Sequence, residues 1–170
     1  AATDAAAGAA SSADGWRVGI RDPRAPESLA AVVTLADGAS TASSGDYERF
    51  FEVDGVRYAH IVDPRSGLPA RGVAAVSVIA PSGMDADALS TTLYVLGPGR
   101  GACLLETRPG AGALWFLDDG GSAERPLTAL VAGERAGAFS RAGESQDGFG
   151  VASADDPARA FERARCTTEG

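Results

Sequence analysis

The sequence predicts an α+β domain with a largely antiparallel sheet and one or two packed helices. Short apolar segments bounded by turn residues recur along the chain, an Asp-Gly pair separates two of them, and one stretch carries leucines at helical spacing. The predicted order of elements, in which several strands are followed by a helix and then by another strand, favours this class over a doubly wound parallel sheet. With 170 residues and 45% apolar composition, one globular domain is expected.

The first segments predict a lead-in followed by two strands. Residues 1–14 are rich in Ala, Ser and Gly without an apolar period, which indicates a flexible lead-in. Residues 16–20 alternate apolar and polar side chains, as a half-buried strand does, and a proline soon afterwards ends the ladder. Leu29–Leu35 is an apolar run that Asp37 and Gly38 stop. The amino-terminal part is therefore expected to contribute strands.

A hairpin is expected around Asp54 and Gly55. Residues 47–53 and 56–62 are strand candidates on either side of this pair. Both turn residues can adopt positive φ, which a two-residue antiparallel turn requires. The two segments are therefore predicted to pair with each other.

The next segments predict strand, helix and strand. Residues 73–79 read as a buried strand, and 111–117 as a later one. Residues 85–96 have leucines at helical spacing and acidic residues in the first turn, and Gly97 and Pro98 supply a stop. A weaker helix is predicted over 101–107.

The carboxy-terminal residues 136–170 are small and polar, and we expect little chemistry from them. Residues 156–165 predict one short helix with proline near its start. Cys103 lies in an apolar run and is expected to be a buried small hydrophobe. Neither Cys103 nor Cys166 belongs to a CxxC pair or a Cys/His cluster, so no zinc or thioredoxin-like site is predicted.

The charge excludes two classes of partner. The net charge is −8, and the 15 basic residues, all arginine, are scattered singly, so no nucleic-acid or anionic-membrane surface is predicted. No apolar stretch approaches the roughly 20 residues needed to cross a bilayer. Membrane contact is expected only through an amino-terminal anchor outside this sequence.

Asp87 and Thr91 are candidate metal ligands. They stand four residues apart on the predicted helix, so their oxygens share one face. Two such oxygens can ligate Mg²⁺, which completes its shell with water and substrate phosphate. The alternative is structural: an acid near a helix start complements the dipole, and a threonine caps or packs. Taken alone, the pair favours the structural role.

The only histidine, His60, is the candidate general base, because imidazole alone changes charge near neutral pH in its unperturbed state. A hydrogen-bonded structural histidine is the alternative. Residues 43–47 and 63–67 are small, polar, glycine-containing loops that can approach an anionic or aromatic ligand, or serve as plain turns. Neither contains a Walker lysine or a GxGxxG turn, so P-loop and Rossmann phosphate sites are not predicted.

Three segments, in this order and spacing, resemble the second half of ApbE-type FAD:protein FMN transferases: WRVGIRDP, SSGDYERFFEVDGVRYAHIVDPRSGLP and DADALSTTLYVLG. The hallmarks of that family are a TSGDY-like loop, an HI[IV]DP[RK]TG segment and an ADALST helix. Ser43 and Ser66 stand where the family usually has Thr, and each keeps the hydroxyl. The resemblance assigns residues 15–135 to this region and 136–170 to a polar tail. Family members are longer, and their amino-terminal half adds to the flavin pocket.

The resemblance implies a role for each candidate residue. Asp87 and Thr91 become ligands of a catalytic Mg²⁺, and His60 assists proton removal from an acceptor hydroxyl. The residues implied to line the FAD site are Ser44, Gly45, Asp46 and Tyr47, with Arg65 and Ser66 as weaker candidates for the same pocket.

The function implied is Mg²⁺-dependent transfer of FMN from FAD to a Thr or Ser hydroxyl of an acceptor flavoprotein, with release of AMP. Two alternatives stay open: an FAD pyrophosphatase that yields FMN and AMP, and a flavin-binding fragment without catalysis. Members of the family are often extracytoplasmic and anchored at the cell envelope, but the sequence itself does not assign a compartment to this chain.

Overall fold

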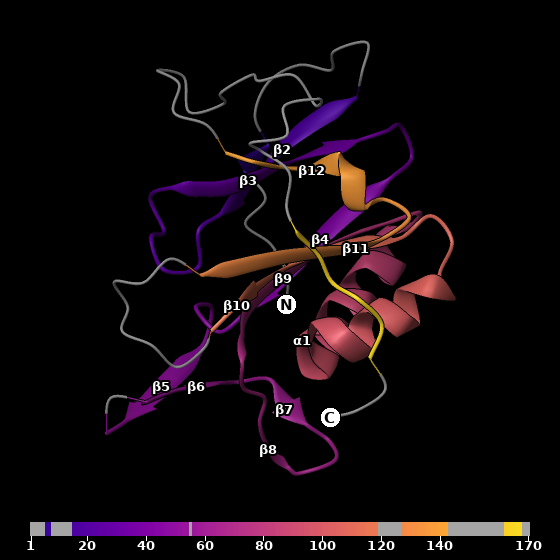
Figure 1. The fold of residues 1–170 in the computed structure, drawn as a ribbon. Helices are drawn as coiled ribbons and strands as arrows, with labels where there is room; N and C mark the ends of the chain where they lie inside the picture. The colour runs from indigo at the N-terminus through magenta and orange to yellow at the C-terminus, as the bar shows by residue number, and fades with distance from the viewer. Residues whose placement is uncertain (1–5, 8–14, 55, 119–126, 143–161, 168–170) are drawn as a thin grey trace.

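The computed structural model describes residues 6–7, 15–54, 56–118, 127–142 and 162–167. They form three layers, with helix α1 (Gly83–Glu106) on one face of a five-stranded sheet and a four-stranded sheet on the other (Figure 1). This confirms the predicted α+β class. No helix among these residues is long and apolar enough to cross a membrane.

The five-stranded sheet has the order β13-β11-β10-β9-β4, and the four-stranded sheet has the order β1-β2-β3-β12. Every neighbouring pair is antiparallel except β11 with β13. The strands of the first sheet are β4 (Ser40–Gly45), β9 (Val73–Ala80), β10 (Gly112–Leu117), β11 (Thr128–Gly133) and β13 (Glu162–Arg163). Those of the second are β1 (Ala6–Ala7), β2 (Trp16–Arg21), β3 (Leu29–Leu35) and β12 (Phe139–Arg141), which follows a 3-10 turn, η1 (Ala136–Ala138).

Two small hairpins leave the layered body. One pairs β5 (Phe50–Val53) with β6 (Val56–Ala59), and the other pairs β7 (Val62–Asp63) with β8 (Leu68–Pro69). Asp54 has a φ of 51°, as the predicted turn requires. The hairpin prediction is therefore confirmed. The strands are shorter than expected, because residues 46–49 form a turn and His60 and Ile61 leave the ladder.

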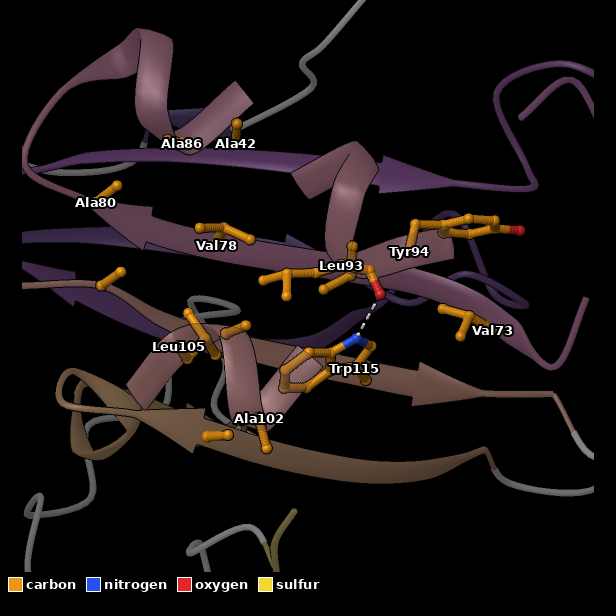
Figure 2. Packing of buried hydrophobic residues seen from close by; sticks show 14 of the residues in the cluster. Ala42, Val73, Val78, Ala80, Ala86, Leu93, Tyr94, Ala102, Leu105 and Trp115 are labelled. Carbon is orange, nitrogen blue, oxygen red and sulfur yellow. Dashed lines mark hydrogen bonds between the residues drawn. The ribbon is translucent and has the colours of Figure 1, made fainter. Parts of the chain in front are cut away.

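The middle sheet is buried on both faces, and strand alternation explains how. On β10, Ala113 and Trp115 pack toward α1, while Leu114 and Phe116 pack toward the four-stranded sheet. The Trp115 indole donates a hydrogen bond of 3.1 Å to the Leu93 carbonyl of α1 (Figure 2). Because a buried indole N–H needs an acceptor, this bond fixes the helix on the sheet.

Local signals set both the start and the interruption of α1. Ser82 caps it: its hydroxyl accepts from the Asp85 N–H at 3.1 Å and donates to the Asp85 carboxylate at 2.6 Å. At Gly97 the helix leaves α geometry with a φ of 71°, which glycine adopts without strain. Pro98 then opens a second half that runs to Glu106. The predicted stop is therefore an interruption, followed by the predicted second helix.

Several expectations from the sequence were wrong in detail. Part of the expected 43–47 loop belongs to β4, whose small polar residues form a strand because β9 pairs with them. No strand was predicted over Thr128–Gly133, which form β11. Of the expected flexible lead-in, Ala6–Ala7 pair with β2, and the other residues before Gly15 lie outside the described ranges.

The carboxy-terminal expectations also change. Glu162–Arg163 form a strand beside β11 rather than part of a helix, and residues 156–161 lie outside the described ranges. Cys103 is not a free core thiol, because it forms a disulfide with Cys166 across a sequence separation of 63. The Thr167 N–H also donates to the Gly99 carbonyl, at 3.3 Å. This last described segment therefore joins the edge of β11 to the second half of α1.

Candidate functional site

A cavity of about 360 Å³ lies where the end of β4, the base of the β5–β6 hairpin and the first half of α1 meet. Its lining comprises Ser43, Ser44, Gly45, Glu48, His60, Ile61, Val62, Asp87 and Thr91. Five residues implied by the resemblance therefore face one space, although they come from three separate segments. Its volume is near the lower end of the range for ligand pockets.

The helix wall of the cavity presents Asp87 and Thr91 one turn apart, both exposed. Ser90 lies beside them on the inward face and is fully buried. Its hydroxyl donates to the Asp87 carbonyl at 2.9 Å and lies 2.8 Å from the Ser44 hydroxyl. Ser90 therefore ties this turn of the helix to β4.

These hydrogen bonds determine where the hydroxyl protons lie, since each hydroxyl has one. Ser90 uses its proton on the Asp87 carbonyl, so Ser44 must donate to Ser90. The Thr91 hydroxyl, 3.3 Å from Ser44, is then the donor in that contact. The lone pairs of the Thr91 oxygen stay available to a cation beside the Asp87 carboxylate.

This donor set fits Mg²⁺, which prefers oxygen ligands and commonly binds one or two carboxylates together with substrate phosphate. Within the described ranges, no group of three or more His, Cys, Asp or Glu side chains could hold a metal ion. A cation at Asp87 and Thr91 would therefore depend on phosphate and water to complete its shell. A soft-metal site built from thiolates and imidazoles does not match these residues.

His60 enters the cavity from the end of β6. Its Nδ1 lies 3.0 Å from the Arg49 carbonyl, and its backbone N–H donates to the same oxygen at 3.1 Å. A carbonyl can only accept, so Nδ1 carries a ring proton, and in the neutral imidazole Nε2 then has the lone pair. The hydrogen bond thereby prepares the other ring nitrogen to accept a proton.

Gly45 lines the cavity, while Tyr47 lies behind it. A Cβ on Gly45 would collide with the Tyr47 ring, so glycine is required for this close approach. Tyr47 is half-buried and packs against the core between the two sheets. Asp46 is buried as well, and its carboxylate pairs with Arg24. Neither Tyr47 nor Asp46 is among the residues that line the cavity.

Arg65 and Ser66 belong to the exposed turn between β7 and β8 and do not line the cavity either. The Arg65 guanidinium donates to the Asp63 carboxylate at 2.7 Å, which lowers the pKa of Asp63. The Ser66 hydroxyl accepts from the Leu68 N–H at 3.2 Å. Both side chains therefore form hydrogen bonds within the β7–β8 hairpin.

Four residues at the site were not predicted from the sequence, namely Glu48, Ile61, Val62 and Ser90. Ser90 had a signal, because it is a polar residue on the leucine face of the predicted helix, and a buried hydroxyl needs a partner. Glu48 and Val62 had none, because only the turn at 46–49 and the break after β6 bring them to the cavity.

Comparisons with known proteins found a matching family, similar sequences and similar structures. A model of the ApbE family matches residues 4–115. A Treponema pallidum protein named FAD:protein FMN transferase is 49% identical over 105 residues, which cover 61% of this chain and 29% of that protein. The crystal structure of the Thermotoga maritima ApbE protein aligns with a TM-score of 0.54 and 43% identity, covering 63% of this chain and 34% of that one.

The apo form of the flavinyl transferase ApbE from Pseudomonas stutzeri aligns with a TM-score of 0.52 and 38% identity, over 69% of this chain and 35% of that one. The chain thus spans about a third of the length of these proteins. The family match, which covers more than half of the chain, and the shared fold lead to one conclusion. This chain belongs to the ApbE family.

Proposed function

We propose that this chain provides the metal-binding and proton-accepting part of an FAD:protein FMN transferase site. The substrate would be FAD, the acceptor a Thr or Ser hydroxyl of another flavoprotein, and the second product AMP. One observation carries the proposal: Asp87, Thr91 and His60, which the family resemblance implies as site residues, face the same cavity. Homologues named FAD:protein FMN transferase support it.

The chemistry is a phosphoryl-type transfer. The acceptor hydroxyl oxygen attacks the phosphorus of the FMN half of FAD, the bond from that phosphorus to the bridging oxygen breaks, and AMP leaves with the bonding electrons. Nε2 of His60 accepts the proton of the attacking hydroxyl. Asp87 and Thr91 would hold Mg²⁺, which when bound neutralises charge on the diphosphate.

The size of the cavity limits what these residues can hold. At about 360 Å³ it suits the diphosphate and the incoming hydroxyl, so the flavin and adenine groups are expected to extend beyond it. On the β4 side the cavity is lined by Ser43, Ser44 and Gly45. Asp87, Thr91 and His60 are exposed, which lets a protein acceptor reach them, and water as well.

We also propose an oxidising, extracytoplasmic location, as expected for the family. The disulfide between Cys103 and Cys166 supports it, because disulfides persist in such compartments and are rare in a reducing cytosol.

The test is to incubate the chain with FAD, Mg²⁺ and a flavoprotein acceptor, measuring AMP by chromatography and the acceptor by mass spectrometry. AMP together with an FMN-modified acceptor supports the transferase. AMP released equally without acceptor would identify a pyrophosphatase, and bound FAD left intact would identify a flavin-binding protein. Asp85→Ala is the matched control for Asp87→Ala, since both acids lie near the start of α1 and only Asp87 lines the cavity.

A further inference from the structure

Arg24, in the segment after β2, joins two carboxylates that are distant in sequence. Its two terminal nitrogens donate to the two oxygens of Asp46, at 2.6 and 2.7 Å. One of them also donates to Asp118, at 2.7 Å. The side chains of Arg24 and Asp46 are only 15% and 8% exposed, so this pair is largely shielded from water. We call Arg24, Asp46 and Asp118 the arginine clamp.

The clamp meets the end of β4. Asp46 directly follows Gly45, the last residue of that strand, and its N–H donates to the Ala74 carbonyl at 2.9 Å. Asp118 directly follows β10. Arg24 therefore links the segment after β2 to the ends of two strands of the other sheet. Figure 2 shows Tyr94 of α1 pointing toward this end of the sheet, where Val73 lies.

A short series of contacts leads from the clamp to both walls of the candidate site. Before Asp46, Ser44 lines the cavity and contacts Thr91. After Asp46, the turn reaches Arg49, whose carbonyl holds His60. On β6, Arg57 lies 3.9 Å from the Asp46 carboxylate, a further link to the hairpin. The position of Asp46 thus bears on the strand wall and on the histidine together.

The energetics make Arg24 necessary for this position. A nearly buried carboxylate that loses its hydrogen-bonded cation is strongly destabilised, and Arg57, 3.9 Å away, is too distant to replace the two hydrogen bonds from Arg24. Without Arg24 the Asp46 side chain would turn toward water and move the turn at 46–49 with it. The two-pronged geometry also orients Asp46 more tightly than a point charge would.

The geometry points to Arg24 as a positioning residue of the candidate site. Through Asp46 it sets the end of β4 relative to the base of the hairpin, so that His60 and Thr91 face one cavity. Asp46 then serves as the group that Arg24 holds, and not as a direct contact of the flavin. The consequence for catalysis depends on the proposed function, whereas the consequence for the geometry does not.

The geometric arm uses the single histidine of the chain as a reporter. In Arg24→Met, the His60 ring signals in NMR spectra should shift and broaden relative to the wild type, without FAD present. Arg24→Lys, which keeps the charge without the two-pronged contact, should show a smaller shift in the same direction. If Arg24→Met does not fold, Arg24→Lys replaces it in this test. Asp118→Asn should show a smaller effect still, because Asp118 is the more exposed partner. Unchanged His60 signals in a folded Arg24 variant would overturn the inference.

The kinetic arm measures AMP release with an acceptor. Arg24→Met should lower kcat about 10- to 100-fold, as misplacement of reacting groups does, with a smaller change in KM for FAD. Adding Asp46→Asn should make the enzyme no worse, because the two residues act as one unit. A further loss of FAD affinity in the double variant would show that Asp46 touches the ligand, contrary to the inference.

The Cys103→Ser/Cys166→Ser variant is the control for lost stability, since its site lies in the second half of α1. If it changes kcat and the His60 signals as Arg24→Met does, the effect is general destabilisation and the inference fails. If the wild type releases no AMP, the proposed function fails, and the NMR arm still decides whether Arg24 positions His60.

Discussion

The two halves of α1 meet at Gly97 and are held to the protein in different ways. The first half packs on β4 and β9 through buried residues such as Ser90, and it presents Asp87 and Thr91 to the candidate site. The second half is joined covalently to the last described segment through Cys103 and borders another cavity, of about 710 Å³.

This difference suggests a division between chemistry and stability. Side chains that meet a substrate must be exposed, so Asp87 and Thr91 add little to the packing that holds their own helix. The disulfide lies beyond the interruption at Gly97 and is not part of the cavity lining. Variants of the cavity-lining residues in the first half should therefore change activity, and loss of the disulfide in the second half should change the free energy of unfolding.

The largest expected effect is that of Asp87→Ala, which should abolish Mg²⁺-dependent AMP release. Because this carboxylate is exposed, the free energy of unfolding should change by less than about 0.5 kcal/mol. Asp85→Ala should do the reverse: it should keep activity and lose about 0.3 to 1 kcal/mol, because its carboxylate accepts from the Ser82 hydroxyl and complements the dipole of the helix. An Asp87→Ala protein that melts early but stays active when folded would show that Asp87 is only a helix-start acid.

His60→Asn should lower transfer to the acceptor by about 10² to 10⁴-fold, the usual contribution of one general base. The asparagine amide can still donate to the Arg49 carbonyl, so the hairpin base should keep its position. FAD and Mg²⁺ affinities, measured by fluorescence titration and calorimetry, should stay as in the wild type. Equal transfer rates in the two proteins would assign His60 a purely structural role.

Cys103→Ser/Cys166→Ser should lower the free energy of unfolding by about 2 to 4 kcal/mol, because the disulfide closes a long loop in the unfolded chain. Urea unfolding with and without a reductant measures this, and the reductant should have no effect on the variant. Transfer by the folded variant should be unchanged. A folded variant with a clearly lower transfer rate would contradict the division between the two halves of α1.

The smallest effect is expected from Arg65→Ala. The Arg65 guanidinium lowers the pKa of Asp63 below its ordinary value of 3.8, so the pair stabilises the folded chain above that pH and the contribution is lost as the pH falls through the lowered pKa. Both side chains contact water, so melting temperatures at neutral pH should differ only slightly and should converge at low pH. A clear loss of FAD affinity would instead place Arg65 in the flavin pocket, as the resemblance implies.

The parts of the fold that could be predicted are those with local signals. The hairpin at Asp54 needed only a turn pair between two strand candidates. Helix α1 needed leucine spacing, acidic residues in its first turn and glycine after its first half. Strand β4 lacked such a signal, because its Ser, Thr, Ala and Gly residues have little apolar pattern. It is a strand because β9 provides the partner.

For the candidate site, the sequence alone singled out Asp87, Thr91, His60 and the segment containing Ser44 and Gly45, because residue type and a family pattern identify chemistry. Only the tertiary structure decided which of the implied residues share a cavity. It placed Asp46 against Arg24 and joined Cys103 to Cys166. Such pairings depend on where distant strands end, and no local preference encodes the distance between residues separated by many positions in the chain.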